Sequence, residues 1–381
     1  MDPDKYFAIL APCEFKCLTR STWDLSDWMF SGKASLLVGL LAVPVLSHQR
    51  QRNFTSKLKN ELPRVATAHG TSRITIWSLP TEIHLMILDQ VDEYDCACFG
   101  LTHIYFWQLA LPVLHDKWAS SMAPWAGKKI VASGIELEPG DFPNALFSID
   151  EAVTLVLSKF HSNLDRIQTM YVDPIGQLSL RELLTLFDFF NLSDEQPIIT
   201  CESKLESLKS VVRKRGHTVP HEGLSTCFQA NELTEFTEED FYPRNEPWIL
   251  RNLTKREFVR SEAIALKPEY VRGPVIELVG FGEALLSRIC WSSNPDVAID
   301  RGPWAGHRFD IITLSRHAAT TRKEDWIDVS EEVSDSLHTI WNANCTPEWQ
   351  DFVTDRSIEI QEGAVYNSSK VLPLQATAVR F

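Results

Sequence analysis

The sequence predicts an α+β protein in which a three-helix unit precedes a larger mixed α+β domain with an antiparallel sheet. Residues 76–115 show helical hydrophobic periodicity, and the patterns Ser148-x-x-Glu151 and Ser179-x-x-Glu182 fit capping boxes that begin helices. Strand-like runs follow at 248–252, 274–279, 284–291 and 309–314. We therefore expect a helical unit at 76–115 and an α+β domain at 125–360. A poorly ordered or partly helical extension over 1–70 and a loose tail over 361–381 are expected around them.

The length, charge and cysteine spacing of the chain exclude several classes of protein. The chain has 381 residues and a formal net charge of −14, so it has room for two or three domains but lacks the basic footprint of a nucleic-acid-binding protein. Its eight cysteines follow neither a disulfide framework nor a zinc-binding spacing. We therefore expect an intracellular protein, cytoplasmic or nuclear, with no nucleic-acid partner and no metal or other cofactor.

An apolar run covers residues 34–46. It is shorter than the roughly 20 residues that a membrane-spanning helix needs, and runs of this length are more often buried helices. We expect a helix that packs within the chain or on a partner. A membrane anchor is the alternative interpretation.

A Leu-Pro pair at 79–80 marks the start of a helix whose apolar residues surround most of its circumference. At 100° per residue these side chains spread over roughly 260°, whereas a helix lying on one core needs a stripe of about 100°. One side can pack on this chain, and another side remains for a partner. The apolar residues are Ile83, Leu85, Met86, Ile87, Leu88 and Val91.

Two further helices are predicted directly after this one. The acidic turn Asp92 to Asp95 can cap a helix that contains Cys96. Thr102 can cap a third helix, which Pro112 is expected to end or kink. Three helices in so short a stretch form a small core that normally leans on a partner or a neighbouring domain.

The first helix carries a family resemblance. The pattern Leu79-Pro80-x-Glu82-Ile83-x-x-x-Ile87-Leu88-x-x-Val91-x-x-x-Asp95 resembles an F-box, the module that joins a substrate receptor to a cullin-type ubiquitin ligase through a Skp-type adaptor. The resemblance implies that the adaptor-facing residues are Leu79, Pro80, Ile83, Ile87, Leu88 and Val91.

The third helix departs from the F-box pattern. The family usually shows a Trp followed three residues on by Leu, but here Trp107 has Ala110 at that offset while Phe106 has Leu109. We expect Phe106 to take the aromatic position. The whole chain also resembles a group of fungal F-box-like proteins of unassigned substrate.

The tetrapeptide Pro-Trp-Ala-Gly occurs twice, at 124–127 and at 303–306, each time before a strand-like run. We interpret each copy as a turn whose Trp packs under the following strand. Two copies do not form a repeat array, which needs at least three units.

The sequence shows no catalytic motif. It has no complete glycine-rich phosphate loop, no nucleophile elbow and no spaced metal-ligand set. Glu277, Glu283 and Asp310 could in principle pair across strands, but we expect solvated or ion-paired residues. The leading hypothesis is therefore a non-catalytic ubiquitin-ligase subunit that binds a Skp-type adaptor, and through it a cullin, and selects an unknown protein substrate. The alternatives are a membrane-tethered interaction protein held by residues 34–46 and an enzyme built on the C-terminal sheet.

Overall fold

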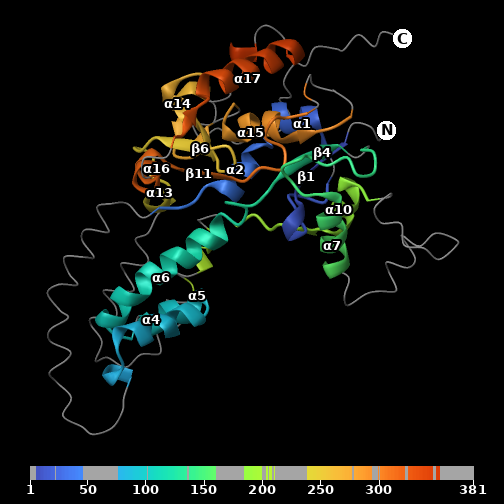
Figure 1. The fold of residues 1–381 in the computed structure, drawn as a ribbon. Coiled ribbons are helices and arrows are strands. Elements are labelled where there is room, and N and C mark those ends of the chain that lie inside the picture. The colour runs from blue at the N-terminus through green and yellow to red at the C-terminus, as the bar shows by residue number, and fades with distance from the viewer. Residues whose placement is uncertain are drawn as a thin grey trace, which may run out of the picture. The chain divides into compact units, whose positions relative to one another are not determined.

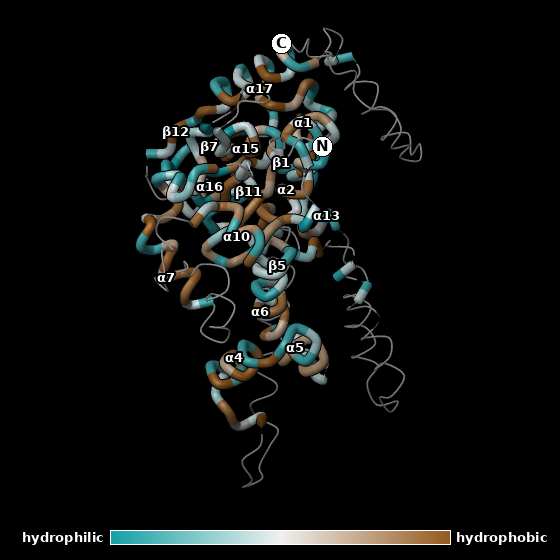
Figure 2. Tube along the Cα trace, turned by 90° about the vertical axis from the view of Figure 1, so that its right-hand side faces the viewer, coloured by the Kyte–Doolittle hydropathy of each residue, from teal (hydrophilic) through white to brown (hydrophobic). Residues whose placement is uncertain are grey.

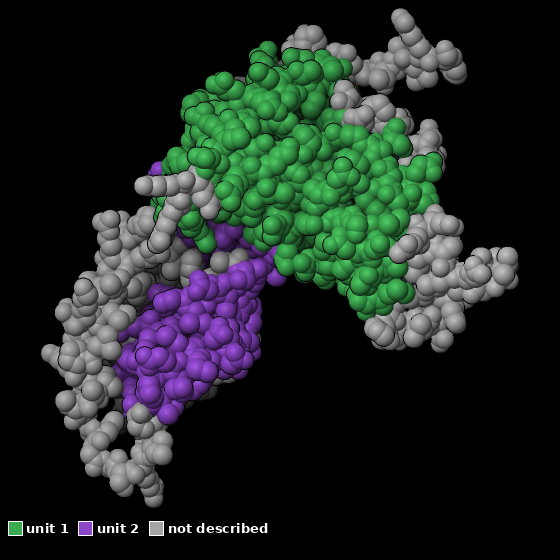
Figure 3. Space-filling model, viewed as in Figure 1, with its two compact units in different colours: residues 1–42, 125–198, 246–381 green, residues 43–124, 199–245 purple. Residues whose placement is uncertain are grey.

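The computed structural model divides the chain into two compact units (Figure 3). Unit 1 comprises Met1–Ala42, Trp125–Ile198 and Glu246–Phe381, and unit 2 comprises Val43–Pro124 and Ile199–Asn245. The structure describes residues 6–21, 23–45, 76–100, 102–134, 137–159, 184–199, 203–204, 206–207, 210, 238–276, 279–293, 299, 301–321, 325–345 and 349–351.

Unit 1 begins much earlier in the chain than the sequence indicated. Strand β1 (Tyr6–Ala11) lies inside its first sheet, and Phe7 and Leu10 are buried there. The expectation of an extension over 1–70 is therefore wrong for residues 6–42, and the tail over 361–381 lies outside the described residues. Residues 199–245, which the expected range 125–360 includes in the α+β domain, cluster with the helical unit instead.

Unit 1 is a mixed α+β structure with two larger sheets (Figure 1). The first has the order β10-β4-β1-β2-β5, with β3 pairing with β1, and the second has the order β11-β6-β7-β12. Their strands are β2 (Lys16–Cys17), β3 (Trp23–Asp24), β4 (Val131–Gly134), β5 (Asp194–Glu195), β6 (Trp248–Asn252), β7 (Glu257–Arg260), β10 (Cys290–Trp291), β11 (Phe309–Thr313) and β12 (Ile327–Asp328). A small hairpin joins β8 (Val271–Arg272) to β9 (Val275–Ile276).

The prediction of an antiparallel sheet is correct for most strand pairs and wrong for the outer strands β5, β10 and β12. β1 is antiparallel to β2 and β4, and β6 is antiparallel to β7 and β11. The outer strands β5, β10 and β12 pair in parallel. They are two-residue strands reached by connections through helices, which is how parallel neighbours are normally joined.

Several helices pack against these sheets. They are α1 (Leu25–Phe30), α2 (Ser35–Leu41), α7 (Ile149–Lys159), α10 (Leu186–Leu192), α14 (Ser261–Ile264), α15 (Phe281–Ile289), α16 (Leu314–Thr320) and α17 (Ser330–Asn344), with short 3-10 turns at Pro12–Glu14 and Pro268–Tyr270. The capping box of Ser148 and Glu151 is confirmed by two reciprocal hydrogen bonds of 2.7 and 3.3 Å. The box at 179–182 lies outside the described residues.

Helix α15 was predicted as a strand over 284–291, and that prediction is wrong. All nine residues of α15 are buried, among α1, α2 and α17 (Figure 1). A helix that is buried on every side is apolar on every side, so its sequence loses the periodicity that would separate it from a buried strand.

The apolar run at 34–46 forms the short buried helix α2. Leu37, Val38, Leu40 and Leu41 lie in the core of unit 1, which leaves these side chains unavailable to lipid. The interpretation of this run as a buried helix is confirmed for residues 35–41. Within the part of the chain that the structure describes, no helix is both long and apolar enough to cross a bilayer.

Unit 1 contains the same arrangement of elements twice. The first copy consists of β1, β2, α2, the turn at 125–127, β4 and β5. The second consists of β6, β7, α15, the turn at 304–306, β11 and β12. The strand orders β4-β1-β2-β5 and β11-β6-β7-β12 agree, as does the direction of every pairing.

Local details repeat in the two copies as well. The turn after β1 places Phe15 at φ 48°, and the turn after β6 places Arg256 at φ 59°. The carbonyl of each accepts a 2.9 Å hydrogen bond from the edge strand of its copy, from Asp194 N in the first and from Ile327 N in the second. Because a non-glycine residue with positive φ is uncommon, its recurrence at one place in both copies supports their equivalence.

The two Pro-Trp-Ala-Gly turns mark where the copies meet. Gly127 N donates to Phe309 O at 2.7 Å, and Gly306 N donates to Ile130 O at 2.9 Å. Trp125 and Trp304 are both 1% exposed, and the Trp304 ring lies 5.8 Å from that of Phe309 in the following strand. The tetrapeptide therefore belongs to a twofold internal repeat. The two copies of this repeat pair with each other, so further repeat units are not required.

The copies also exchange a strand segment. Ala42, after α2 of the first copy, bridges in parallel to Ile311 in the second copy. Cys290, after α15 of the second copy, pairs in parallel with Ala132 in the first. Each sheet is thus completed by the other copy.

The helical residues of unit 2 are inserted into the first copy. The chain leaves unit 1 after Ala42 and returns at Trp125, whose N–H donates to Leu40 O at 3.0 Å. In the second copy Trp304 N donates to Arg288 O at 2.9 Å, and the corresponding connection is only residues 292–302. The two ends of the insertion are therefore fixed next to each other, a geometry that tolerates an inserted module.

Candidate docking site

Unit 2 carries the three helices that the sequence predicted. They are α4 (Thr81–Gln90), α5 (Glu93–Gly100) and α6 (Ile104–Met122), with a 3-10 turn at Ile76–Ser78 and a short helix α13 (Glu238–Phe241). Asp92 caps α5 by accepting the N–H groups of Tyr94 and Asp95 at 2.9 and 2.8 Å, as predicted.

The start and end of α6 differ from the prediction. His103, rather than Thr102, caps the helix, because its Nδ1 accepts Tyr105 N–H at 3.1 Å. Pro112 lies inside α6, and the helix continues to Met122. Proline removes one helical hydrogen bond, but the buried apolar side of α6 extends well past it.

The three helices enclose a compact core. It contains ten buried residues, from α4 (Leu88), α5 (Cys96, Ala97), α6 (Trp107, Ala110, Leu111, Leu114, Trp118, Met122) and α13 (Phe241). Gly100 lets α5 approach α6 closely, since a Cβ there would lie 2.9 Å from Ala110 Cβ. Burial raises the pKa of the Cys96 thiol to about 11, so Cys96 is an unreactive packing residue.

An aromatic cluster fixes the segment that enters α4. The rings of Trp77 and Phe106 lie 4.7 Å apart, and those of His84 and Phe106 lie 5.1 Å apart. His84 Nε2 lies 2.7 Å from Ile76 O and therefore donates, so Nδ1 accepts the Tyr105 hydroxyl at 3.1 Å. Phe106 thus contacts the His84 ring of α4.

Residues from the second part of unit 2 complete this helical structure. Lys204 Nζ forms an ion pair with Glu93 at 2.7 Å, and both side chains are largely buried. Phe241 packs edge-on against Trp118, with ring centroids 5.3 Å apart. Lys204 and Phe241 are therefore part of the helical unit, a contribution for which the sequence shows no periodic signal.

One side of α4 is buried and another carries exposed apolar side chains. His84 is 1% and Leu88 is 0% exposed, and this pair faces the core. Ile83 and Met86 are 38% and 63% exposed, and Ile87 beside them is half-buried. Spacings of three and four residues make these three side chains neighbours on the helix. We call Ile83, Met86 and Ile87 the docking face; Figure 2 shows the apolar segments of α4.

The six site residues predicted from the sequence fall into three groups according to their exposure. Pro80 and Ile83 are exposed, whereas Leu79, Ile87 and Val91 are half-buried, with Val91 packed against the core. Leu88 is fully buried. Its assignment as a partner-facing residue is therefore wrong, because a side chain with no exposed surface cannot contact another protein.

Met86 belongs to the docking face although it was not among the predicted site residues. It is the most exposed large apolar residue among those that the structure describes. Its helical spacing from Ile83 was the signal that could have identified it. Leu85 is also 39% exposed, but it lies on another side of α4, next to Glu82 and Asp89.

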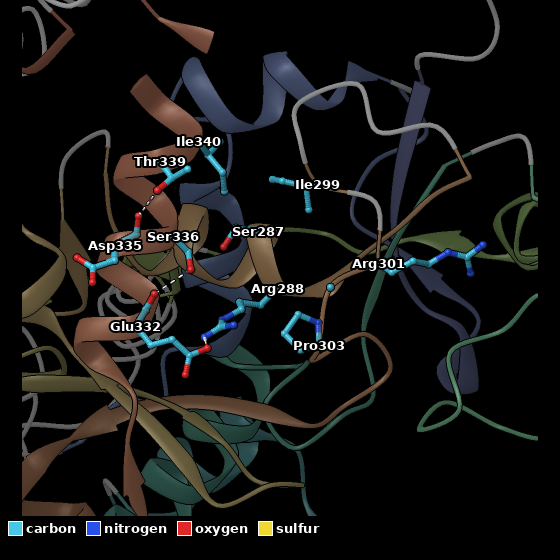
Figure 4. Close-up of a pocket in the computed structure, with 11 residues that line it drawn as sticks. Ser287, Arg288, Ile299, Arg301, Pro303, Glu332, Asp335, Ser336, Thr339 and Ile340 are labelled. Atoms are coloured by element: carbon cyan, nitrogen blue, oxygen red, sulfur yellow. Dashed lines mark hydrogen bonds and ion pairs between the residues drawn. The ribbon is translucent and has the colours of Figure 1, made fainter. Parts of the chain in front are cut away.

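A cavity of about 510 Å³ lies in unit 1 between α15, α17 and residues 299–303 (Figure 4). Arg288 Nη2 is paired with Glu332 at 2.5 Å, and its guanidinium stacks over Trp304 at 5.0 Å. Arg301 forms two 2.6 Å bonds with Asp141. Both arginines in the cavity lining are thus already paired within unit 1.

The carboxylates considered as catalytic candidates do not form a site. Asp310 is held by Arg251 at 2.7 Å, Glu283 caps the first turn of α15, and Glu277 lies outside the described residues. Among the residues that are described, no three His, Cys, Asp or Glu side chains form a group that could hold a metal ion.

Comparisons of the chain with models of protein families, with curated proteins and with solved structures found no match.

Proposed function

We propose that the protein is a non-catalytic substrate receptor of a cullin-type ubiquitin ligase, in which α4 to α6 form an F-box-like unit that binds a Skp-type adaptor. Unit 1 would then select the protein to be modified, and the transfer chemistry would come from other subunits.

The observation that carries this proposal is the two-sided character of α4. Its inner side is filled by His84 and Leu88, so the exposed Ile83 and Met86 are not needed for the core of unit 2. Exposed apolar side chains gathered on one helix face typically mark a protein interface. The sequence pattern around them resembles the adaptor-binding helix of the F-box.

A pull-down with a Skp-type adaptor tests the proposal. The double variant Ile83→Asp with Met86→Asp should weaken adaptor binding at least 100-fold, because two charges would be placed in an apolar contact. Both positions are exposed in the free protein, so the fold should persist, which circular dichroism can check.

Leu85→Asp is the matched control. It makes the same substitution on the same helix at 39% exposure, but outside the docking face, and should leave binding within about threefold of the wild type. Unchanged adaptor recovery by the double variant, or equal loss with Leu85→Asp, would rule out the docking face as the adaptor site.

A further inference from the structure

The turn between β6 and β7 holds an ordered polar cluster in the second copy of unit 1. Asn252 Oδ1 accepts the N–H groups of Thr254 and Lys255, both at 3.1 Å. Asn252 Nδ2 lies 2.9 Å from His307 Nδ1. Because the amide nitrogen is a donor, Nδ1 is the acceptor, and His307 carries its proton on Nε2.

Positive charge surrounds this imidazole. His307 is 7% exposed, and burial together with the charges of Lys255 and Lys129 lowers its pKa to about 4. Arg308, the next residue, is exposed, and its N–H donates to Thr254 Oγ1 at 3.0 Å. Within the described residues no acidic side chain pairs with Lys255, and His307 Nε2 has no hydrogen-bond partner.

The equivalent place in the first copy is neutralised. The counterparts of Lys255 and His307 are Glu14 and Lys128, and Lys128 Nζ donates to Glu14 Oε1 at 2.7 Å. In the first copy the carboxylate of Glu14 in the turn thus balances the charge of Lys128 on the facing segment. In the second copy the same turn position holds Lys255, which adds a positive charge.

Lys129 Nζ donates to Leu146 O at 2.6 Å, so its ammonium group already has a partner. We propose that His307 and Lys255 bind an oxyanion group, a phosphate or a carboxylate, on the protein that unit 1 recruits. The group would take the role that the Glu14 carboxylate has in the first copy, accepting the Nε2–H of His307 while the Lys255 ammonium group balances its charge. This assignment of substrate chemistry rests on the receptor function proposed above.

Titration of the full-length chain with inorganic phosphate tests the site. At pH 7 and constant ionic strength, we expect a saturable shift of the His307 imidazole NMR signal, which His307→Gln identifies by its loss. A parallel titration with sodium acetate separates the two sources of the group: tighter binding of phosphate indicates a phosphorylated segment, and tighter binding of acetate indicates Asp or Glu side chains. A wild-type signal that moves with neither anion would overturn the proposal.

Two variants separate a specific site from general electrostatic attraction. Lys255→Glu combined with His307→Lys reproduces the ion pair of the first copy, so the fold should be kept while Lys255→Glu alone weakens anion binding at least tenfold. In the double variant, binding at this site, followed through the backbone N–H signal of Thr254, should be lost. Lys267→Glu makes the same charge change at another exposed position of unit 1 and should have less than a twofold effect.

Equal weakening by Lys255→Glu and Lys267→Glu would show that only net charge matters and would refute the site. The adaptor pull-down distinguishes this failure from failure of the receptor function, because Lys255→Glu lies in unit 1 and should leave adaptor recovery unchanged.

Discussion

The two copies within unit 1 share a backbone arrangement, but different kinds of side chain cover the outer face of their sheets. In the first copy the chain from β4 to β5 includes α7 and α10 and builds an apolar cluster over the sheet. Phe142, Phe147 and Phe189 pack together there, with ring centroids 5.0 to 6.4 Å apart. In the second copy the connection from β11 to β12 is much shorter, and its described residues form the one helix α16.

A polar cluster takes the place of these aromatic residues in the second copy. Arg251 makes bidentate bonds of 2.8 and 2.7 Å to Asp310, on the adjacent strand. Its guanidinium lies 5.2 Å from the Trp326 ring, and its Nη1 lies 3.4 Å from His317 Nδ1. Burial, followed by the charge of Arg251, lowers the pKa of His317.

The counterparts of Arg251 and Asp310 are Leu10 and Val131, both fully buried. The comparison teaches that strand order and turn geometry define the repeat, while the residues that cover the sheet can be exchanged. A long connection can bring apolar side chains over the strands. Where the connection is short, a paired and stacked arginine covers the same position with fewer residues.

The most disruptive test of this comparison breaks the ion pair of the second copy. Asp310→Val should lower the free energy of unfolding by about 3–5 kcal/mol, because it leaves the Arg251 charge buried without its partner. Adding Arg251→Leu gives the second copy the residues of the first and should recover most of the loss. Urea denaturation followed by tryptophan fluorescence measures both variants, and a double variant as unstable as Asp310→Val would contradict the equivalence of the copies.

The second test compares the helices α2 and α15. Glu283 in α15 is the counterpart of Ser35 in α2, which is exposed. Glu283 is 2% exposed, one of its oxygens has no partner among the described residues, and burial raises its pKa to about 8. The folded protein therefore keeps this carboxyl protonated while the unfolded chain ionises it above about pH 4.5, so its contribution to stability is lost as pH rises from about 4.5 to 8.

Glu283→Gln removes that titration. The free energy of unfolding of the variant, relative to the wild type, should rise by about 4 kcal/mol between pH 4.5 and pH 8. Ser35→Glu places a carboxyl at the exposed counterpart and should leave the pH dependence unchanged. Denaturation curves at several pH values provide the measurement, and parallel stability profiles for wild type and Glu283→Gln would show that the carboxyl is ionised in the folded state.

The smallest expected effect concerns the crossing of the same two helices. A Cβ at Gly282 would lie 2.2 Å from the carbonyl oxygen of Ala34, its counterpart in the first copy. Gly282→Ala should therefore cost about 1–3 kcal/mol through overpacking. The control Ala34→Gly removes a methyl group and should cost at most about 1 kcal/mol. Thermal unfolding compares them, and a Gly282→Ala variant as stable as the wild type would indicate that the helices can separate at this point.

The helices that sequence reasoning found through caps and helical spacing have one buried and one solvated side. α5 and α7 have acidic or hydroxyl caps, and α4 carries apolar residues at helical spacing, so their positions were predictable. α15 was missed because every residue in it is buried. The repeat was missed because its copies share little beyond the Pro-Trp-Ala-Gly turns, and the positive-φ position is occupied by Phe15 and Arg256 rather than by glycine.

In α4, too, part of the structure could not be predicted from the hydrophobic pattern, here at the level of single residues. The sequence showed that α4 is apolar on more than one side, but not which side the core would take. The contacts of His84 with Ile76 and Tyr105 fix that choice, since they turn Leu88 inward and Met86 outward. A polar residue that becomes buried through specific hydrogen bonds has no signature in a hydrophobic pattern.

The strand exchange between the copies has a consequence for synthesis of the protein on the ribosome. The sheet that contains β1 receives its last strand, β10, from residues 290–291, and Ile311 completes the pairing of Ala42. Strand β4 must therefore wait for its partner β10 until most of the chain has emerged, whereas α4, α5 and α6 are contiguous and can begin to pack as soon as they are translated. The nascent protein would thus present these helices while β4 and Ala42 are still without their later partners, and this interval is when it would depend most on chaperones.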